Sequence, residues 1–267
     1  LGREAFPPIS VASGAFHLCV LFADGSVVCF GDNSYGQTET PLFFGNVTEL
    51  AAGDFHSCVI LSTGYVQCWG DDRFGQSSDL TIPWLVGLSL GAEHSCALDW
   101  RGEITCWGNQ ESGQTLAGNH SGDVVSLKAG GYFNCALEGS GRTVCWGQNK
   151  NKQVRVPPSA SSLVSLATGR ESACGITDLG SVVCWGGALP GDTPQPSINN
   201  PVALAMGDEH ACALDAQGEV LCWGANGVHA QTVVPSVLEN GIAIESGARH
   251  SCAIQEGGAV LCWGSPR

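Results

Sequence analysis

The chain has 267 residues and a formal net charge of −14, with 25 acidic against 11 basic side chains. This balance argues against nucleic acid and anionic membrane surfaces as partners, because both select clustered lysine and arginine. No apolar run approaches the roughly eighteen residues that a membrane-spanning helix needs. We therefore expect contact with a membrane only through a span that this chain does not contain.

The 14 cysteines fall into seven copies of a fifteen-residue unit, of which residues 17–31 are the first. In each copy the second cysteine follows the first by ten positions, and an aromatic residue and a glycine come next. The pairs are Cys19 with Cys29, Cys58 with Cys68, Cys96 with Cys106, Cys135 with Cys145, Cys174 with Cys184, Cys212 with Cys222 and Cys252 with Cys262. Because the first cysteines recur about every 39 residues, seven units account for residues 1–267. We expect a single domain.

A glycine that lies six residues after each first cysteine indicates how the unit folds. If Cys19 faces Cys29 across an antiparallel pair, residues 23–25 form a three-residue loop that ends at Gly25. Such loops end on a left-handed residue, and glycine adopts that conformation at least cost. Facing residues place their Cβ atoms about 4.5–5.5 Å apart, close to what a disulfide needs. We predict seven hairpins, each with its own disulfide.

The cysteine pattern also predicts the compartment. Zinc sites favour ligands two to four residues apart, and no cysteine pair has that spacing. Regularly paired cysteines require an oxidising environment, so we interpret the chain as an extracellular segment. The sequons that begin at Asn46 and Asn119 agree with a eukaryotic secretory route, and we expect glycosylation there.

Each unit follows the same order along the chain. A short apolar run precedes Gly-x-x-His-x-Cys, then come a second strand, Trp-Gly and a polar loop that often continues as Gly-Gln-Thr toward a proline. Period-two alternation, β-branched residues and regular turn signals indicate strands throughout, and helical periodicity is absent. Four short strands per unit and seven units predict an all-β chain folded as a seven-bladed β-propeller.

The two ends of the chain suggest how the ring closes. The last unit ends at residues 264–267 without the Gly-Gln-Thr segment of the other units. Residues 2–7 align with residues 36–41, which contain that segment in the first unit. We therefore expect residues 1–8 to complete blade seven. Closure of this kind removes an exposed sheet edge.

The motifs Gly-x-x-His-x-Cys-Ala-Leu, Asp-x-Gly-x-Val-x-Cys-Trp-Gly and Asn-x-x-x-Gly-Gln resemble the repeat of the regulator of chromosome condensation superfamily over the whole chain. Among cysteine-bearing relatives, the chain resembles the ectodomain of Crinkly-type plant receptor kinases, which have seven such repeats with paired cysteines. Residues 133–137 (Phe-Asn-Cys-Ala-Leu) and 144–147 (Val-Cys-Trp-Gly) are most similar to that subfamily. Secreted bacterial propellers that inhibit β-lactamases share the Gly-Gln-Thr…Val-Pro phrase, but typically not the cysteines.

The Crinkly resemblance implies a receptor at the cell surface, whose propeller binds a peptide or protein outside the plasma membrane and contributes to signalling in development. A cysteine-rich module, one membrane span and a Ser/Thr kinase would follow the propeller, and none of them lies in this chain. For the chain itself we expect no enzymatic activity and no cofactor. No phosphate-binding glycine motif or defined catalytic constellation emerges from the sequence.

A histidine two residues before the first cysteine suggests metal at first sight. It occurs in five units, whereas Phe133 and Ser172 replace it in units four and five. Residues placed once per blade lie too far apart to share an ion. We therefore predict a structural role, in which each imidazole is hydrogen-bonded to neighbouring backbone. The five residues are His17, His56, His94, His210 and His250.

The tryptophans divide into two groups. Those of the Trp-Gly motif recur too regularly for a binding site, and we predict that they pack between blades. Trp100 lies at a hairpin tip where the other copies have smaller or polar residues, which suggests either a partner anchor or a local cover. We expect Trp84 to pack beneath its connection.

The loop after Trp-Gly differs in every unit and must emerge on the same face of the ring. Unlike loops on a rigid scaffold are typical of a recognition surface. Tyr35, Asp72, Arg73 and Phe74 are our candidate anchors, together with Trp100. The alternative is that these loops are solvated turns that are free to vary.

Three classes of function remain open from the sequence. The resemblance favours a receptor ectodomain for a peptide or protein ligand. A free secreted binder, either an enzyme inhibitor or a lectin, fits the same scaffold, although unlike loops argue against identical sugar sites. A structural ectodomain that associates with itself is the third possibility.

Overall fold

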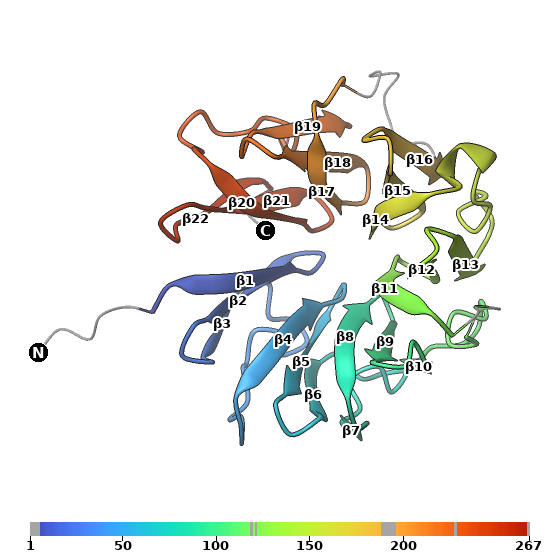
Figure 1. Ribbon diagram of the computed structural model, residues 1–267. Helices are drawn as coiled ribbons and strands as arrows, with labels where there is room; N and C mark the ends of the chain where they lie inside the picture. Colours follow the sequence, from blue (N-terminus) through green and yellow to red (C-terminus); the bar gives the residue numbers. More distant parts are fainter. Residues whose placement is uncertain (1–5, 118–119, 121, 188–195, 227–228, 266–267) are drawn as a thin grey trace, which may run out of the picture.

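The computed structural model describes residues 6–117, 120, 122–187, 196–226 and 229–265. These residues form seven antiparallel sheets arranged around a central axis, with one turn of 3₁₀ helix at Pro158–Ala160 (Figure 1). The predicted all-β, seven-bladed architecture is confirmed.

The seven sheets are consecutive in sequence. Their strands are β1 (Pro8–Ser13), β2 (His17–Phe22) and β3 (Val27–Gly31); β4 (Val47–Ala52), β5 (His56–Leu61), β6 (Tyr65–Gly70) and β7 (Leu80–Thr81); β8 (Leu85–Leu90), β9 (His94–Asp99) and β10 (Ile104–Gly108); β11 (Val124–Ala129), β12 (Phe133–Glu138) and β13 (Thr143–Gly147); β14 (Leu163–Thr168), β15 (Ser172–Thr177) and β16 (Val182–Gly186); β17 (Pro201–Met206), β18 (His210–Asp215) and β19 (Val220–Gly224); β20 (Gly241–Ser246), β21 (His250–Gln255) and β22 (Val260–Gly264).

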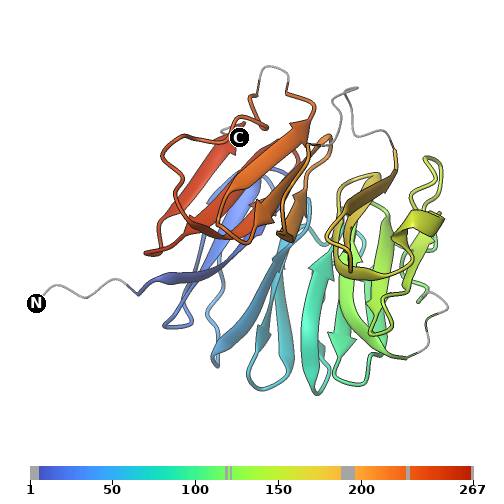
Figure 2. The ribbon, with the colours of Figure 1, turned by 45° about the horizontal axis from the view of Figure 1, so that its top comes forward.

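The first strand of every blade is the innermost one, and the second and third strands follow outward (Figures 1 and 2). The prediction of four strands per blade is wrong for six blades within the described ranges, because only blade two has a fourth strand, β7. The outer segments of other blades carry prolines such as Pro41, Pro157 and Pro235. Proline has no N–H to donate to a ladder, but Pro83 also lies two residues after β7, and residues 115–123 of blade three contain no proline, so proline alone does not decide where a fourth strand forms.

The predicted hairpin register is confirmed. Cys19 faces Cys29 in the β2–β3 pair, and the same facing pair recurs in every blade. Gly25 closes the first loop with a φ of 80°, and its N–H donates to the carbonyl of Phe22 at 2.9 Å. The turn therefore has the left-handed glycine that the repeat spacing predicts.

All seven predicted disulfides are confirmed, one within each blade. The Cα atoms of each disulfide lie 4.0–4.1 Å apart, because the two cysteines face each other across neighbouring strands. No described cysteine is left free. The bonds join Cys19 to Cys29, Cys58 to Cys68, Cys96 to Cys106, Cys135 to Cys145, Cys174 to Cys184, Cys212 to Cys222 and Cys252 to Cys262.

The hydrophobic core lies between blades, where one apolar cluster fills each interface. Between blades four and five, for example, Phe133, Leu166 and Trp185 pack together. The Trp185 indole also donates a hydrogen bond to the carbonyl of Gln153 in the preceding blade at 3.0 Å. The same bond joins four further Trp-Gly tryptophans to the blade before them. The prediction that these tryptophans pack between blades is confirmed.

Blades one and seven also pack against each other. Val11, Val20 and Ile254 form an apolar cluster there, and the Ala248 N–H donates to the Ala15 carbonyl at 3.3 Å. Pro8 already belongs to β1 of blade one. The rest of the predicted closing segment falls largely on residues 1–5, which lie outside the described residues, so completion of blade seven stays a prediction.

Four of the five motif histidines bond side chains across a blade interface, which corrects the expected backbone partner. His56 Nε2 lies 2.8 Å from Ser95 Oγ, and the Ser95 hydroxyl donates to the Gln76 carbonyl at 2.8 Å. Ser95 must therefore accept its proton from His56 Nε2–H. The other ring nitrogen is buried without a partner and faces Gly53, where a Cβ would lie 2.5 Å from the ring.

This geometry excludes the charged imidazole. Burial lowers the pKa of His56 to about 3, and that of each of the other four to about 4. The two interfaces that lack the histidine also lack the hydroxyl acceptor. Where Phe133 or Ser172 replaces the histidine, the next blade has Ala173 or Ala211 at the position of Ser95. The two positions thus change together at these interfaces, whereas His250 of blade seven is matched in blade one by Leu18, which has no acceptor.

The combined variant His56→Phe, Ser95→Ala copies the Phe133–Ala173 interface and is expected to reduce the pH dependence of stability by the share of one buried histidine. Unfolded histidine takes up a proton near pH 6.5, whereas folded His56 does not above about pH 3. Wild-type stability therefore falls as pH drops from 6.5 toward 4, by roughly 3 kcal/mol per buried histidine. Denaturant titrations between pH 7 and pH 4 measure the slope, with His229→Gln as a control outside the interfaces. An unchanged slope in the combined variant would contradict this account.

Candidate recognition surface

The antiparallel blades give the ring two unlike faces. The turns between the first and second strands lie on the same face as the loops after Trp-Gly, as shown by the bond from Asp32 N–H to the Phe16 carbonyl at 2.9 Å. We call this the loop face. The tips of the second-to-third-strand hairpins, such as residues 23–25, lie at the opposite end of the strands and form the hairpin face.

A buried glutamine fixes each described loop of the Gly-Gln type. Gln76 is fully buried; its amide donates to Asp71 Oδ2 at 3.0 Å and its carbonyl oxygen accepts from Phe74 N–H at 2.9 Å. Gln37 holds Tyr35 N–H and Asp32 in the same way, at 2.9 Å and 2.7 Å. These bonds prevent the loop from rearranging and determine where the Tyr35 and Phe74 side chains project.

Asp72 is part of the same loop framework. Its Oδ1 accepts the Ser77 N–H at 3.0 Å. The structure thus gives Asp72 a local role that explains its presence, and its part in binding stays a prediction. Equivalent bonds from a backbone N–H to an Asn side chain occur in three other loops, from Thr38 to Asn33, from Val154 to Asn149 and from Thr232 to Asn226.

Aromatic side chains of blades one and two gather on the loop face. The Tyr35 and Phe16 rings lie 5.2 Å and 6.4 Å from the Phe55 ring. The Arg73 guanidinium lies 4.8 Å above the Tyr35 ring and forms two 2.9 Å bonds to the Asp71 carboxylate. We call Phe16, Tyr35, Phe55 and Arg73 the aromatic patch. The structure therefore brings together Tyr35 and Arg73 from the predicted set, and Phe74 lies 43% exposed on the same loop as Arg73.

The rest of the loop face is mixed, with acidic residues predominant at the position before the motif histidine and with Tyr132 and Arg249 at that position in blades four and seven. The position of Phe16 and Phe55 is occupied by glutamate in blades three, five and six, at Glu93, Glu171 and Glu209. Arg170 and Asp54 form an ion pair of 3.0 Å between blades five and two at the mouth of the central channel. Burial raises the pKa of the nearby Asp208 to about 6, and Arg170 opposes that shift. The aromatic patch is therefore chemically distinct from its surroundings.

Trp100 lies on the hairpin face, away from the other predicted anchors. Together with Trp84, Leu85 and Val86 it lines a hollow of about 340 Å³. The expectation that Trp84 packs beneath its connection is wrong, because 73% of this residue is exposed. Its backbone has a φ of 64°, unusual for a bulky residue, in the turn that leads into β8.

Phe16 and Phe55 were missed by the sequence analysis, although the repeats contain the signal. The position before the motif histidine reads Phe, Phe, Glu, Tyr, Glu, Glu and Arg from blade one to blade seven. A framework position would repeat one residue type, as the neighbouring glycine does. Variation among equivalent positions on one face was the reason to predict that the loops after Trp-Gly form a recognition surface. The same reasoning applies to the position before the motif histidine.

The sequons, possible metal sites and possible membrane spans are the remaining points to compare with the structure. Asn46 is exposed on the hairpin face, whereas Asn119 lies outside the described residues, and glycosylation of both stays a prediction. Within the described ranges, no cluster of His, Cys, Asp or Glu is arranged to hold a metal ion. In the same ranges, no helix has the length and apolarity needed to cross a membrane.

The family model of the regulator of chromosome condensation (RCC1) repeat matches residues 9–37, 47–76, 86–114, 202–229 and 242–267, more than half of the chain. The chain belongs to this family. No curated protein matches it by sequence. The RCC1 model does not match blades four and five, where Phe133 and Ser172 replace the motif histidine, yet both blades have the same sheet order and disulfide as the others.

Solved structures with the same architecture include two Crinkly-type ectodomains. The entire ectodomain of the receptor kinase CR4 from Physcomitrella patens is 23% identical, with a TM-score of 0.82 over 97% of this chain and 74% of that one. The Crinkly ectodomain of the receptor kinase ACR4 from Arabidopsis thaliana is 24% identical, with a TM-score of 0.77 over 97% and 96%. Prp20p from Saccharomyces cerevisiae is 20% identical, with a TM-score of 0.55 over 96% and 72%. The chain is an RCC1-like propeller close in structure to Crinkly ectodomains.

Gln76→Ala is expected to loosen the loop that carries Arg73 and Phe74. The change leaves the Phe74 N–H without its acceptor and removes a bond to Asp71, at a cost of about 1–3 kcal/mol. Hydrogen exchange at the Phe74 amide measures the effect. The matched control is Gln110→Ala, an exposed glutamine in the corresponding loop of blade three. Equal exchange rates in the two variants would show that Gln76 does not hold the loop.

Proposed function

We propose that this chain is an extracellular recognition domain of a Crinkly-type plant receptor kinase and that it binds a protein or peptide through the aromatic patch of the loop face. The observation that carries the proposal is this patch on a propeller stapled by seven disulfides. The likeness to two Crinkly ectodomains supports the cellular setting.

The patch has the chemistry of an interface hot spot. Tyrosine and arginine are enriched among residues that contribute most to binding, because they combine a large apolar area with polar groups. Tyr35 is 40% exposed, so contact area remains to be buried. Arg73 is held over the Tyr35 ring by Asp71, and the buried Gln37 fixes the loop. Such preorganisation reduces the entropy lost on binding.

A macromolecular partner fits the shape of this surface better than a small molecule. The patch lies over two blades on the exposed end of the ring, with an acidic area beside it. Yeast Prp20p, a propeller with a similar fold, is described as binding Gsp1p and histones, which supports proteins as partners of this architecture in general. The acidic area favours a ligand that also carries basic residues, by charge complementarity.

Tyr35→Ala and Arg73→Ala are each expected to weaken ligand binding at least tenfold, because a hot-spot truncation costs about 2 kcal/mol or more. The purified, disulfide-intact propeller serves as bait for extracellular proteins and peptides, and surface plasmon resonance then measures the Kd of the captured ligand. Leu179→Ala, at an 88% exposed hairpin-tip residue of blade five, is the control. A ligand whose affinity depends on Trp100 rather than on Tyr35 would place binding on the opposite face.

The receptor setting has a separate test in the full-length transcript. Codons for a membrane span and a Ser/Thr kinase downstream of Arg267 are expected. A stop codon directly after the propeller would instead favour a free secreted binder.

A further inference from the structure

The central channel contains a cavity of about 460 Å³ that the proposed protein interface does not use. Its wall is formed by the first strands of the blades, β1, β4, β8, β11, β14, β17 and β20, and by the turns that follow them. Comparison of the seven strands shows which side chains the fold requires there. At the fifth position five copies carry only alanine or serine, namely Ala12, Ala51, Ser89, Ala167 and Ala205.

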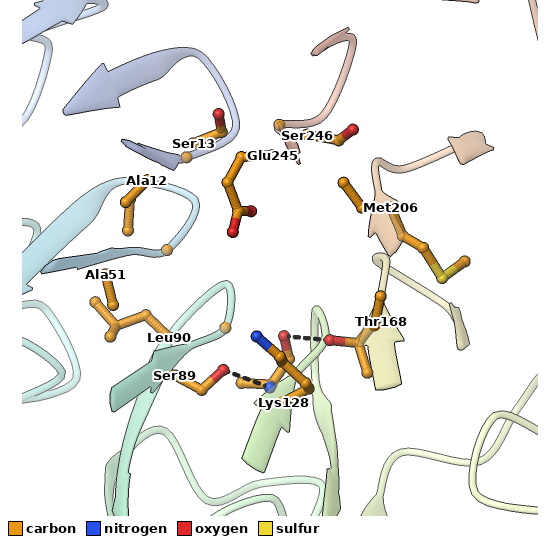
Figure 3. Close-up of a pocket in the computed structure, with 18 of the residues that line it drawn as sticks. Ala12, Ser13, Ala51, Ser89, Leu90, Lys128, Thr168, Met206, Glu245 and Ser246 are labelled. Carbon is orange, nitrogen blue, oxygen red and sulfur yellow. Dashed lines mark hydrogen bonds between the residues drawn. The ribbon is translucent and has the colours of Figure 1, made fainter. Parts of the chain in front are cut away.

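The two remaining copies carry opposite charges at this level. They are Lys128 in β11 and Glu245 in β20, and both side chains project into the channel (Figure 3). At the third position of the strands, where the other copies have serine, glycine or alanine, Glu49 of β4 is the third charged residue on the first strands. Asp54, Arg170 and Asp208, from the turns that follow these strands, also line the cavity at its mouth. Since small residues suffice elsewhere, the fold does not require the three charges on the first strands.

The three charged groups are not paired with one another by contact. Within the described part of the chain, no hydrogen bond or ion pair joins Lys128 to Glu49 or Glu245. Glu49 accepts one hydrogen bond, from the Leu88 N–H at 3.0 Å. Burial raises the pKa of both glutamates, and the positive charge of Lys128 opposes the shift. Partly buried charges without contact partners are costly to maintain.

Hydrogen bonds between blades hold the lysine strand in place. The Ala129 N–H donates to Ser89 Oγ of the preceding blade at 2.8 Å, and the Thr168 hydroxyl of the next blade donates to the Ala129 carbonyl at 2.9 Å (Figure 3). The backbone next to Lys128 is therefore fixed on both sides. The three charges belong to three rigid blades and are held across the cavity by the ring itself.

We propose that the channel binds a basic amino acid, with its carboxylate at Lys128 and its two cationic groups at Glu245 and Glu49. When ionised, the three strand charges sum to −1; at the mouth, Asp54 is already paired with Arg170 at 3.0 Å, and Asp208 lies there too. The complement of the three strand charges is therefore a molecule with one anionic and two cationic groups. A cavity of about 460 Å³ lies in the lower part of the range typical of small-molecule sites. Binding would give Lys128 and Glu245 a contact partner, and would give Glu49 a second one beside the Leu88 N–H.

Isothermal titration calorimetry of the disulfide-intact chain with L-lysine tests the proposal. Two analogues separate the charges: L-norleucine lacks the side-chain cation, and 1,5-diaminopentane lacks the carboxylate. We expect saturable binding of L-lysine, at least tenfold tighter than binding of either analogue. No saturable binding of L-lysine, or equal binding of an analogue, would overturn the proposal.

Variants assign the charges to residues. Lys128→Met is expected to abolish the preference for L-lysine over 1,5-diaminopentane, and Glu245→Gln to weaken L-lysine binding at least tenfold. Ala167→Ser, at the same level of the channel, changes polarity without charge and is the matched control. Thermal unfolding curves confirm that each variant is folded. Unchanged L-lysine binding in Lys128→Met and Glu245→Gln would sink the assignment, whereas protein capture through Tyr35 is independent of both substitutions.

Discussion

The backbone carbonyl of a buried glutamine connects one blade to the next at five interfaces within the described residues, and the surface of the molecule depends on the same residue. The Gln76 carbonyl accepts the Trp107 indole N–H and the Ser95 hydroxyl of the following blade, at 3.0 Å and 2.8 Å. The side chain of Gln76 simultaneously fixes the loop that carries Phe74. Packing between blades and display of the loops are therefore one constraint, because moving the glutamine would break both.

This coupling explains how one scaffold presents unlike loops without losing its shape. Disulfides hold the second and third strands of each blade together, and the indole-to-carbonyl bonds hold neighbouring blades together. The side chains between these fixed points are free to differ. In blades one and two, Phe16 and Tyr35 lie against the Phe55 ring. In blade three, Glu93 occupies the position of Phe16 and Phe55. A propeller of this kind acquires a binding surface by local substitution alone.

The channel follows the same logic on the inner side of the ring. The first strands need only small residues where they line the axis, so a few charged exceptions are accommodated without disturbing the interfaces. Lys128 and Glu245 lie on blades four and seven, which no short stretch of sequence connects. Their approach is a property of the closed ring, and it makes the cavity chemically distinct from both faces.

Repetition allowed the sequence by itself to determine the hairpin, the disulfide pairing and the number of blades. Each of these is a local relation, repeated seven times at constant spacing: ten residues between paired cysteines, and a glycine where the chain must turn. The role of the Trp-Gly tryptophans was predictable for the same reason. The fourth strand was predicted for every blade but is present only in blade two among the described residues. Alternation of polar and apolar residues suggests a strand, but it does not show whether the adjacent strand provides hydrogen-bonding partners along its length.

Only the tertiary structure decided which unlike residues meet. Tyr35 and Phe55 are in different blades, and their contact depends on the angle between neighbouring sheets. Trp84 was expected to pack beneath its connection, but it is exposed and has a left-handed backbone. The bond between Arg170 and Asp54 spans the channel and joins residues 116 positions apart. Contacts of this kind depend on ring geometry, which the repeat implies as a whole but does not specify for any single pair of side chains.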